Sequence, residues 1–203
     1  MGLLSRIMGL PWVYDRLRIA LLGGGPSIEV FGWLGETRAD ILIDTGCGTG
    51  MAMDRLDNFA EYHGFDTDAR ALRWFRQRAL PGNVHLHHAE ATAADLERIR
   101  PTKAILMGIL HHLPDNKAAE LLTMLARYPT LRRAITLDPV FIERKPVNNL
   151  LCRLDRGRYV RTRSQYEALL KAAGFDLLKG EVLTSGNGAA FYFCTLLSSR
   201  QTI

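Results

Sequence analysis

The segment with the strongest structural pattern reads Ile41-Leu42-Ile43-Asp44-Thr45-Gly46-Cys47-Gly48-Thr49-Gly50. Its apolar first half ends in a carboxylate, three glycines follow at alternate positions, and an amphipathic segment comes next. This order predicts a buried parallel strand that turns through a glycine-rich loop into a helix. Glycine has no β-carbon, so we expect a ligand to lie against bare backbone, with the amide groups of the helix start pointing toward it.

The carboxylate of Asp44 bears on which ligand this loop binds. A dinucleotide-binding loop usually reads Gly-x-Gly-x-x-Gly or Ala, and here the third of these positions falls on Met51 or Met53, depending on the glycine pair chosen. A carboxylate two residues before the first glycine would repel a pyrophosphate group. It suits a ligand that has a cationic ammonium group and no phosphate, and S-adenosylmethionine (SAM) is such a ligand.

The pattern Asp-x-Gly-x-Gly-x-Gly at the end of a strand resembles the first motif of the class I SAM-dependent methyltransferases. The resemblance implies that the loop holds the methionine part of SAM, through Asp44, Gly46, Cys47, Gly48 and Gly50. Glycine-rich turns also occur in many α/β proteins, so a purely structural loop stays open at this point.

Length and composition are typical of a single globular domain. A chain of 203 residues can bury a sizeable core, and 47% hydrophobic with 23% charged residues is ordinary for a soluble protein. We expect one domain over residues 1–203, with an N-terminal helical cap over 1–38 and a sheet core over 39–203. No segment reaches the apolar length of a membrane span, and the net charge of +5 favours anionic partners only weakly.

The three cysteines of the chain are far apart in the sequence: Cys47, Cys152 and Cys194. They form neither a metal-binding knuckle nor a disulfide framework. We therefore expect a reducing, cytoplasmic location.

An apolar helical stripe lies within residues 3–8. Arg6 inside this run and Pro11 after it disfavour a signal peptide. The stripe caps one side of the sheet, covers the active site or touches a membrane surface. Residues 12–15, Trp-Val-Tyr-Asp, resemble the N-terminal aromatic segment of many small-molecule methyltransferases, which implies that Tyr14 closes over SAM.

The next strand is predicted over residues 62–65 and ends at Asp66. Asp66 lies about 20 residues after the glycine loop, where a nucleotide-binding unit needs an acceptor for ribose hydroxyl groups. Thr67 or Asp68 can cap the helix that follows, so Asp66 is available for the ribose. We include Thr67 in the expected cofactor site, and a purely capping role for Asp66 remains the alternative.

A third strand is predicted over residues 84–88, and it carries His85, His87 and His88. No Asp, Glu or Cys completes a ligand set at the usual spacing, so we predict no metal site. The following Ala89-Glu90-Ala91 resembles the third segment of the methyltransferase family, which implies that Glu90 and Ala91 contact the adenine.

A fourth strand, over residues 104–108, leads into Gly108-Ile109-Leu110-His111-His112-Leu113-Pro114-Asp115. This run resembles the family's fourth motif, especially in enzymes that act on small molecules and lipids, and places Gly108 in the cofactor site. The Asn/Asp-Pro-Pro-Tyr/Phe motif of amino-methylating nucleic-acid enzymes is absent. The resemblance implies that His111 or His112 stands over the sulfonium, where it acts as a general base or only fixes the loop.

The rest of the chain completes the pattern of alternating strands and helices. We expect a helix over residues 118–125, a fifth strand over 134–137, a basic irregular segment over 141–163, a helix opened by the capping box of residues 164–167, and strands over 177–183 and 190–197. The predicted fold is a Rossmann-like, doubly wound sheet of seven strands. It is mostly parallel, has an antiparallel C-terminal hairpin and carries helices on both faces.

The predicted activity is transfer of a methyl group from SAM to a small or lipid-like acceptor, by in-line O-methylation with S-adenosylhomocysteine (SAH) as product. We expect Arg158 and Arg161 to bind an anionic group of the acceptor, because arginine grips carboxylate or phosphate in bidentate fashion. The alternatives are an RNA methyltransferase and a non-catalytic module that binds SAM or NAD. Nucleic acid is not the expected partner, a peripheral membrane contact stays open, and the sequence leaves the oligomeric state undetermined.

Overall fold

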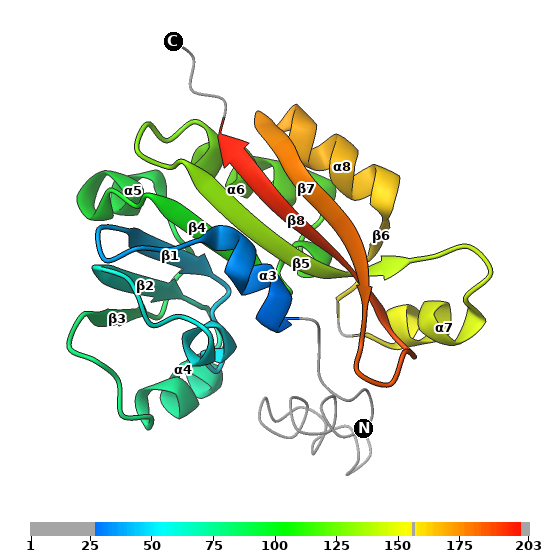
Figure 1. Cartoon of the computed structure of the whole chain (residues 1–203), viewed down its shortest axis with the longest axis horizontal. Helices are drawn as coiled ribbons and strands as arrows, with labels where there is room; N and C mark the ends of the chain where they lie inside the picture. Colours follow the sequence, from blue (N-terminus) through cyan, green and yellow to red (C-terminus); the bar gives the residue numbers. More distant parts are fainter. Residues whose placement is uncertain (1–26, 156, 200–203) are drawn as a thin grey trace.

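The computed structural model of the chain describes residues 27–155 and 157–199. Its strands form one mixed sheet in the order β3-β2-β1-β4-β5-β8-β7, with the short β6 paired to β5 (Figure 1). The strands are β1 Ile41–Thr45, β2 Glu61–Phe65, β3 Val84–His87, β4 Lys103–Met107, β5 Arg133–Phe141, β6 Arg161–Thr162, β7 Phe175–Thr184 and β8 Phe191–Ser199. The helices are α3 Ser27–Leu34, α4 Ala69–Arg76, α5 Ala93–Ile99, α6 Asp115–Ala126, α7 Pro146–Leu154 and α8 Arg163–Ala172, with short 3₁₀ helices η1 Met51–Asp54 and η2 Leu110–His112.

The topology confirms the predicted fold. Strands β1 to β5 pair in parallel, whereas β8 runs antiparallel to both β5 and β7. The chain builds outward from β1 through β2 to β3 and then returns to β4 on the other side of β1. The strand order therefore reverses between β1 and β4, and in open α/β sheets a ligand binds at the carboxyl ends of the strands at such a point.

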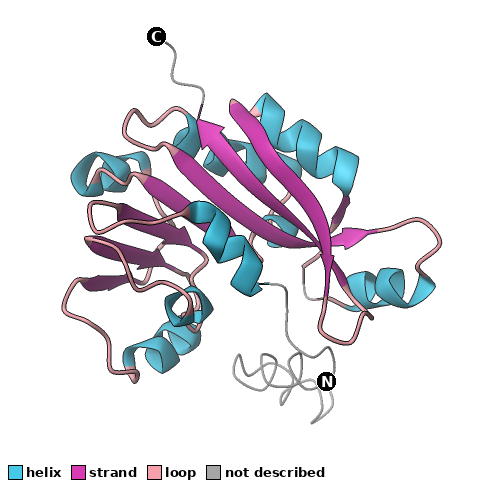
Figure 2. Ribbon diagram, in the orientation of Figure 1, coloured by secondary structure: helices cyan, strands magenta, loops and turns pink. Residues whose placement is uncertain are grey.

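Helices cover both faces of the sheet, as Figure 2 shows. Neighbouring strand residues alternate between the two faces, so Leu42 and Ile105 pack with α3 and α4, whereas Ile43 and Leu106 pack with α5, α6 and α8. Parallel strands that are covered on both faces read as continuous apolar runs, which is the pattern that reveals β1 and β4 in the sequence.

Caps in the sequence mark several helix starts. Asp68 caps α4, as predicted, and its carboxylate accepts hydrogen bonds from the backbone N–H groups of Arg70 and Ala71. The capping box of α8 lies two residues earlier than predicted, because Thr162 and Gln165 form it and the helix begins at Arg163.

Three segments differ from the predictions. The glycine loop leads into the single turn of η1 instead of an α-helix, and β5 continues past Pro139 to Phe141. The segment over residues 141–163 is not irregular throughout, since α7 occupies its middle with Pro146 at its first turn.

The expected N-terminal cap falls mostly outside the described residues, and Tyr14 lies there too. The described part of it, α3, packs through Val30, Phe31 and Leu34 against β5 and β8. Among the described helices, none combines the length and the apolar content that crossing a membrane requires.

Candidate active site

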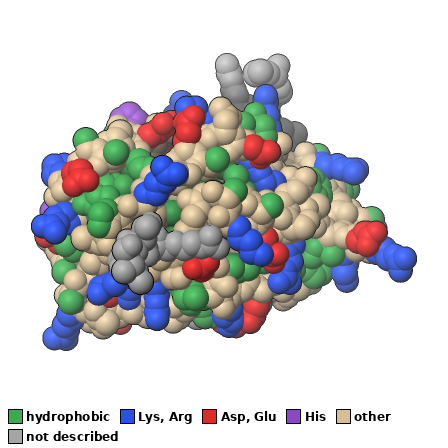
Figure 3. Space-filling model, turned by 90° about the horizontal axis from the view of Figure 1, so that it is seen from above, with side chains coloured by type: hydrophobic (Ala, Val, Ile, Leu, Met, Phe, Trp, Pro, Cys, Tyr) green, Lys and Arg blue, Asp and Glu red, His purple; other side chains and the backbone are tan. Residues whose placement is uncertain are grey.

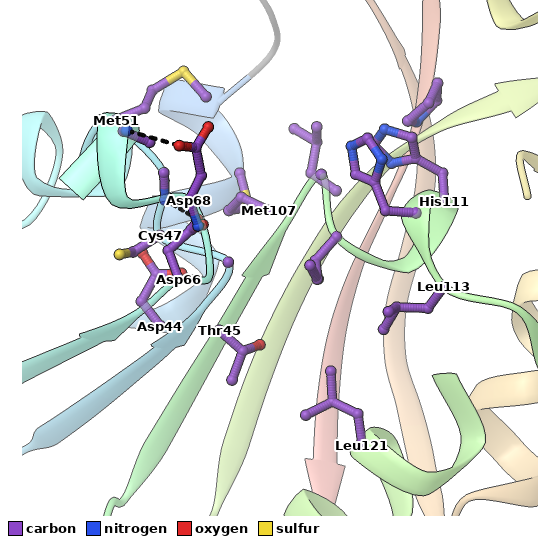
Figure 4. A pocket seen from close by; sticks show the side chains of 18 of the residues that line it. Asp44, Thr45, Cys47, Met51, Asp66, Asp68, Met107, His111, Leu113 and Leu121 are labelled. Carbon is purple, nitrogen blue, oxygen red and sulfur yellow. Dashed lines mark hydrogen bonds between the residues drawn. The ribbon is translucent and has the colours of Figure 1, made fainter. Parts of the chain in front are cut away.

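A cavity of about 1120 Å³ opens at the carboxyl ends of β1, β2, β4 and β5, next to the strand-order reversal. Figure 4 shows Asp44, Asp66, Asp68 and Cys47 on one side of it, and His111, Leu113 and Leu121 on the other. The cavity therefore has two walls of different chemistry, one built by the glycine loop and its neighbours and the other by η2, α6, α7 and β8.

The glycine loop forms the first wall with its backbone. The N–H groups of Gly46 and Cys47 both donate to the carbonyl oxygen of Phe65, at 2.8 and 3.0 Å, which ties the loop to the end of β2. Gly48 has a φ of 56°, and no atom of residues 27–155 or 157–199 lies within 4 Å of the place where a β-carbon would stand, so among these residues this side of the loop is open to a ligand.

Gly50 does not line the cavity, contrary to its expected place in the cofactor site. Its φ is 85°, and a β-carbon there would overlap the ring of Phe75. Gly50 therefore allows the loop to turn tightly over α4, which is a structural role.

Asp44 is 1% exposed and lines the cavity. Its Oδ2 accepts a hydrogen bond from the Tyr62 hydroxyl at 2.5 Å, while its Oδ1 is buried with no hydrogen-bond partner among the described residues. Burial raises the pKa of Asp44 to about 7, with a further contribution from the charge of Asp66. A buried carboxylate oxygen without a partner at a cavity wall fits a cationic ligand group such as an ammonium.

Asp66 is held by two backbone groups. Its Oδ2 accepts from the N–H of Gly48 and its Oδ1 from the N–H of Asp68, both at 2.7 Å. Each carboxylate oxygen can accept a second hydrogen bond, so the side chain is oriented by the protein and can still bind two hydroxyl groups.

The structure brings most of the expected cofactor-binding residues together on this cavity. Those that line it are Asp44, Gly46, Cys47, Gly48, Asp66, Thr67, Glu90, Ala91 and Gly108. Asp44 lies near the end of β1, and the others come from four loops that are far apart in the sequence and that follow β1, β2, β3 and β4.

His111 is buried between two carboxylates. Its Nδ1 lies 2.7 Å from Asp138 and its Nε2 lies 3.3 Å from Asp155. Burial alone would lower the pKa of His111, but hydrogen bonds to these two aspartates and their charges outweigh it and raise the pKa to about 9. The imidazole is therefore protonated at neutral pH, which is unfavourable for a general base.

His112 also lines the cavity, and its side chain is exposed, unlike that of His111. The two rings lie 4.1 Å apart between centroids and are tilted by 39°. Of the two histidines, His112 is the one that an acceptor could reach.

Arg161 is not placed as expected for a side chain that grips an anionic acceptor. It is 6% exposed, and all five of its N–H groups are used inside the protein. They donate to Asp115 twice and to the carbonyl oxygens of Leu110, Leu113 and Tyr159, at 2.6 to 3.0 Å. Arg158 is exposed and does not line the cavity.

The second wall is largely apolar. Aliphatic and aromatic side chains line it: Leu113, Leu121, Met124, Leu151, Leu154, Phe191 and Tyr192. Among the described lining residues Lys117 is the one Lys or Arg, and its ammonium group lies 2.7 Å from Glu120. The described residues therefore offer this wall no strong site for an anion.

The part of this wall that α7 supplies was not predicted from the sequence. Val147, Leu150, Leu151 and Leu154 have the i, i+3, i+4, i+7 spacing of a helix, and this signal was present after Pro146. At the end of α7, Asp155 contacts His111, and a β-carbon on Gly157 would overlap the His111 ring.

Comparisons with known proteins agree with this arrangement. The family model described as a methyltransferase domain matches residues 42–129, which contain the glycine loop, Asp66 and the loop after β4. No curated protein matches the sequence. Three solved structures share the fold.

The first is a complex of a Haloferax volcanii methyltransferase activator with a candidate methyltransferase, at 11% identity and TM-score 0.72 over 93% of this chain and 94% of that one. The second, magnesium protoporphyrin IX methyltransferase of Synechocystis PCC 6803 with bound SAH, has 19% identity and TM-score 0.66 over 96% and 98%. Human N-acetylserotonin methyltransferase in complex with SAM has 18% identity and TM-score 0.63 over 98% and 59%. The strand order and the cavity at its reversal point are those of the fold of these SAM-dependent methyltransferase structures, and within that fold residues 42–129 match the methyltransferase domain family.

Proposed function

We propose that this protein transfers a methyl group from SAM to a small, lipid-like acceptor by O-methylation. The observation that carries the proposal is the contrast between the two cavity walls, one of carboxylates and bare backbone and one of aliphatic side chains. A charged cofactor and an apolar acceptor would each meet a matching surface there.

The first wall would bind the cofactor. SAM supplies a methyl group attached to a positively charged sulfur. The unpartnered oxygen of Asp44 would accept a hydrogen bond from its ammonium group, and Asp66 would accept from the ribose hydroxyls. Glu90 and Ala91 would contact the adenine, which their place on the same cavity supports.

His112 would take the proton of the acceptor hydroxyl. Its exposed side chain at the cavity supports this role, while His111, protonated between Asp138 and Asp155, would position the loop that carries both histidines. Much of the acceleration would come from holding the hydroxyl oxygen in line with the transferred methyl group. The entropy cost of this positioning would be offset by the binding free energy of the two reactants.

The outer surface of α7 supports a lipid-like acceptor. Val147, Leu150 and Leu154 lie at i, i+3 and i+7 and are 61%, 56% and 72% exposed. Leu154 also lines the cavity, so this apolar surface continues into the second wall. Exposed cations flank it: Arg144, Lys145, Arg153 and Arg158.

We infer that this α7 surface rests on an anionic lipid bilayer, from which the acceptor would enter the cavity. Aliphatic side chains would enter the headgroup region, and the flanking cations would be attracted by the negative lipid charge. The three cysteines are buried and free, which supports the expected reducing compartment.

Vesicle flotation tests the membrane contact separately from catalysis. The protein should float with vesicles that contain phosphatidylglycerol and not with pure phosphatidylcholine vesicles, and Leu150→Asp should abolish flotation. Leu178→Asp is the matched control, because Leu178 of β7 is similarly exposed, at 55%. Equal loss in both variants, or flotation that Leu150→Asp does not change, would remove the assignment to α7.

An RNA acceptor has less support in the structure. Arg161, which the sequence offered for phosphate contacts, has no donor left. On the face seen in Figure 3, Lys and Arg side chains are interspersed with acidic ones and form no continuous basic field.

A screen with methyl-labelled SAM tests the function. Lipid, metabolite and RNA extracts are incubated with the protein, and we expect label in the organic-solvent fraction. Calorimetry with SAH, with NAD as the comparison, reports cofactor binding independently. Label in RNA, or SAH binding with no labelled fraction in any extract, would contradict the proposed acceptor class.

A further inference from the structure

A second cluster of potential ligands lies on β2 and β3, away from the cavity. The parallel register places His63 directly beside His85, and Glu61 projects from the same face of β2 two residues earlier. The Glu61 Oε2 and the His63 Nε2 are 2.9 Å apart, and the rings of His63 and His85 are stacked with centroids 4.7 Å apart. Ligand atoms of all three side chains lie within 4.8 Å of one another.

We propose that Glu61, His63 and His85 bind a divalent transition-metal ion of the zinc type. Imidazole nitrogen and carboxylate oxygen are common zinc ligands, and a set of three protein ligands leaves a fourth position for water. Small rotations of the exposed Glu61 and His85 side chains would bring their ligand atoms to bonding distance around one ion, while His63 is fixed inside the protein at 6% exposure.

His87 completes the arrangement as an outer partner. Its Nε2 lies 3.2 Å from the Nδ1 of His63, and the two rings are stacked at 5.5 Å. A metal-binding histidine usually has its second ring nitrogen hydrogen-bonded, which fixes the ring orientation. Here that contact leaves the Nε2 of His63 on the side of Glu61.

The charges around the cluster permit a cation. Glu61 is the acidic ligand, and the neighbouring Arg98 of α5 is paired with Asp95 at 2.7 Å. An ion bound by Glu61 and two neutral imidazoles would therefore face an arginine whose charge is already balanced.

The proposed ion would stabilise the sheet from outside the cavity. None of the three ligands lines the cavity, and Glu61 begins the strand whose far end leads to Asp66, roughly 16 Å away at about 3.3 Å per residue. The ion would cross-link the edge strand β3 to β2. Those two strands carry the loops with Asp66 and Glu90, so bound metal would stabilise the part of the sheet beneath the cofactor wall.

A second group of side chains could also bind a metal ion, and the test must distinguish it from the first. His111, His112 and Asp155 also lie close enough to share an ion. However, both ring nitrogens of His111 already face carboxylates, at 2.7 and 3.3 Å, so this set has less free ligand capacity.

Calorimetry of the purified full chain with zinc chloride, and with magnesium chloride for comparison, tests the site. We expect one zinc ion per chain, no magnesium binding and a raised melting temperature with zinc. Glu61→Gln and His85→Gln should each weaken zinc binding by about 10-fold or more. Both side chains are exposed, so these variants are expected to fold.

His88→Gln is the matched control, because His88 is an exposed histidine next to the same strand whose ring bonds the Thr67 carbonyl instead. It should bind zinc like the wild type. Absence of zinc binding, or binding unchanged in both Glu61→Gln and His85→Gln, would overturn the proposal. Binding lost in His112→Gln but kept in His85→Gln would assign the ion to the cavity and overturn it as well.

Discussion

The two walls of the cavity are held in place by different kinds of interaction. The glycine-loop wall depends on backbone groups: the N–H groups of Gly46 and Cys47 bond the Phe65 carbonyl, and that of Gly48 bonds Asp66. The α7 wall depends on side chains. Asn148, for example, donates to the Val140 carbonyl and accepts from the Phe191 N–H, both at 2.8 Å.

This difference has a functional meaning. A wall made of backbone keeps its shape when side chains change, which suits a cofactor that never varies. The α7 wall has an aliphatic surface and is held by a few buried polar side chains. Its lining residues can therefore be replaced while the polar side chains that hold it are kept. The comparison predicts that substitutions will separate into effects on chemistry, on folding of the α7 wall and on cofactor binding.

The largest effect is expected where the two walls meet, at His112. His112→Gln should lower kcat by about 10²–10⁴-fold, the usual contribution of a general base, and leave SAH affinity unchanged. Kinetics with the identified acceptor and calorimetry with SAH measure the two quantities. Full activity in this variant would show that the acceptor needs no base from this loop.

Next is Arg161, which supports the second wall. Arg161→Ala removes five hydrogen bonds and leaves buried carbonyl groups without donors, so we expect the free energy of unfolding to fall by on the order of 3 kcal/mol. Urea denaturation measures it. Arg158→Ala is the control and should stay within about 0.5 kcal/mol of the wild type, since that side chain is exposed. Similar stability of the two variants would contradict the supporting role of Arg161.

His111 links the second wall to β5, and its contribution to the free energy of unfolding should depend on pH. Its pKa is raised to about 9 in the folded protein, from 6.5. The stabilisation is therefore complete below pH 6.5 and is lost as pH rises through 9. Compared with His111→Gln, the wild type should lose on the order of 3 kcal/mol of unfolding free energy between pH 6.5 and 9.5. A constant difference between the two proteins over this range would mean that His111 is neutral when folded.

The smallest effects are expected for Asp44 in the first wall. Replacing it should stabilise the ligand-free protein and weaken SAM binding. Burial raises the pKa of Asp44 to about 7, so ionisation of this group costs stability as pH rises from about 4 through 7. Asp44→Asn should therefore stabilise the ligand-free protein at pH 8, by on the order of 2 kcal/mol. It should also weaken SAM binding by about 1.5–3 kcal/mol, because a charge-assisted hydrogen bond is lost. Unchanged SAM affinity would exclude the ammonium contact.

The sequence predicted the glycine-loop wall better than the α7 wall. The place of Asp44, Asp66 and most of the glycine loop on the cavity was predictable, because it depends on local order along the chain. Arg161 was misassigned, since its partners are carbonyl groups of the loop after β4, about 50 residues earlier. The Glu61, His63 and His85 cluster was missed because strand register, and not sequence spacing, completes it.

The α7 helix illustrates a different limit. Its apolar residues have helical spacing, but three of them are exposed, so the core formed by the described residues does not explain them. A pattern that faces outward is easily read as an irregular basic segment, because sequence rules for helices assume that the apolar side is buried.

The close packing of Gly157 against His111 fixes the chain just after α7, so the middle of this helix can be varied in enzyme engineering. The helix is attached at its start through Asn148 and Asn149 and at its end through Asp155 and Gly157. A library that randomises Leu150, Leu151 and Leu154 and keeps those four residues would vary the acceptor range without disturbing the cofactor wall. A library that includes position 157 would lose most of its members to misfolding, because every side chain there collides with the imidazole.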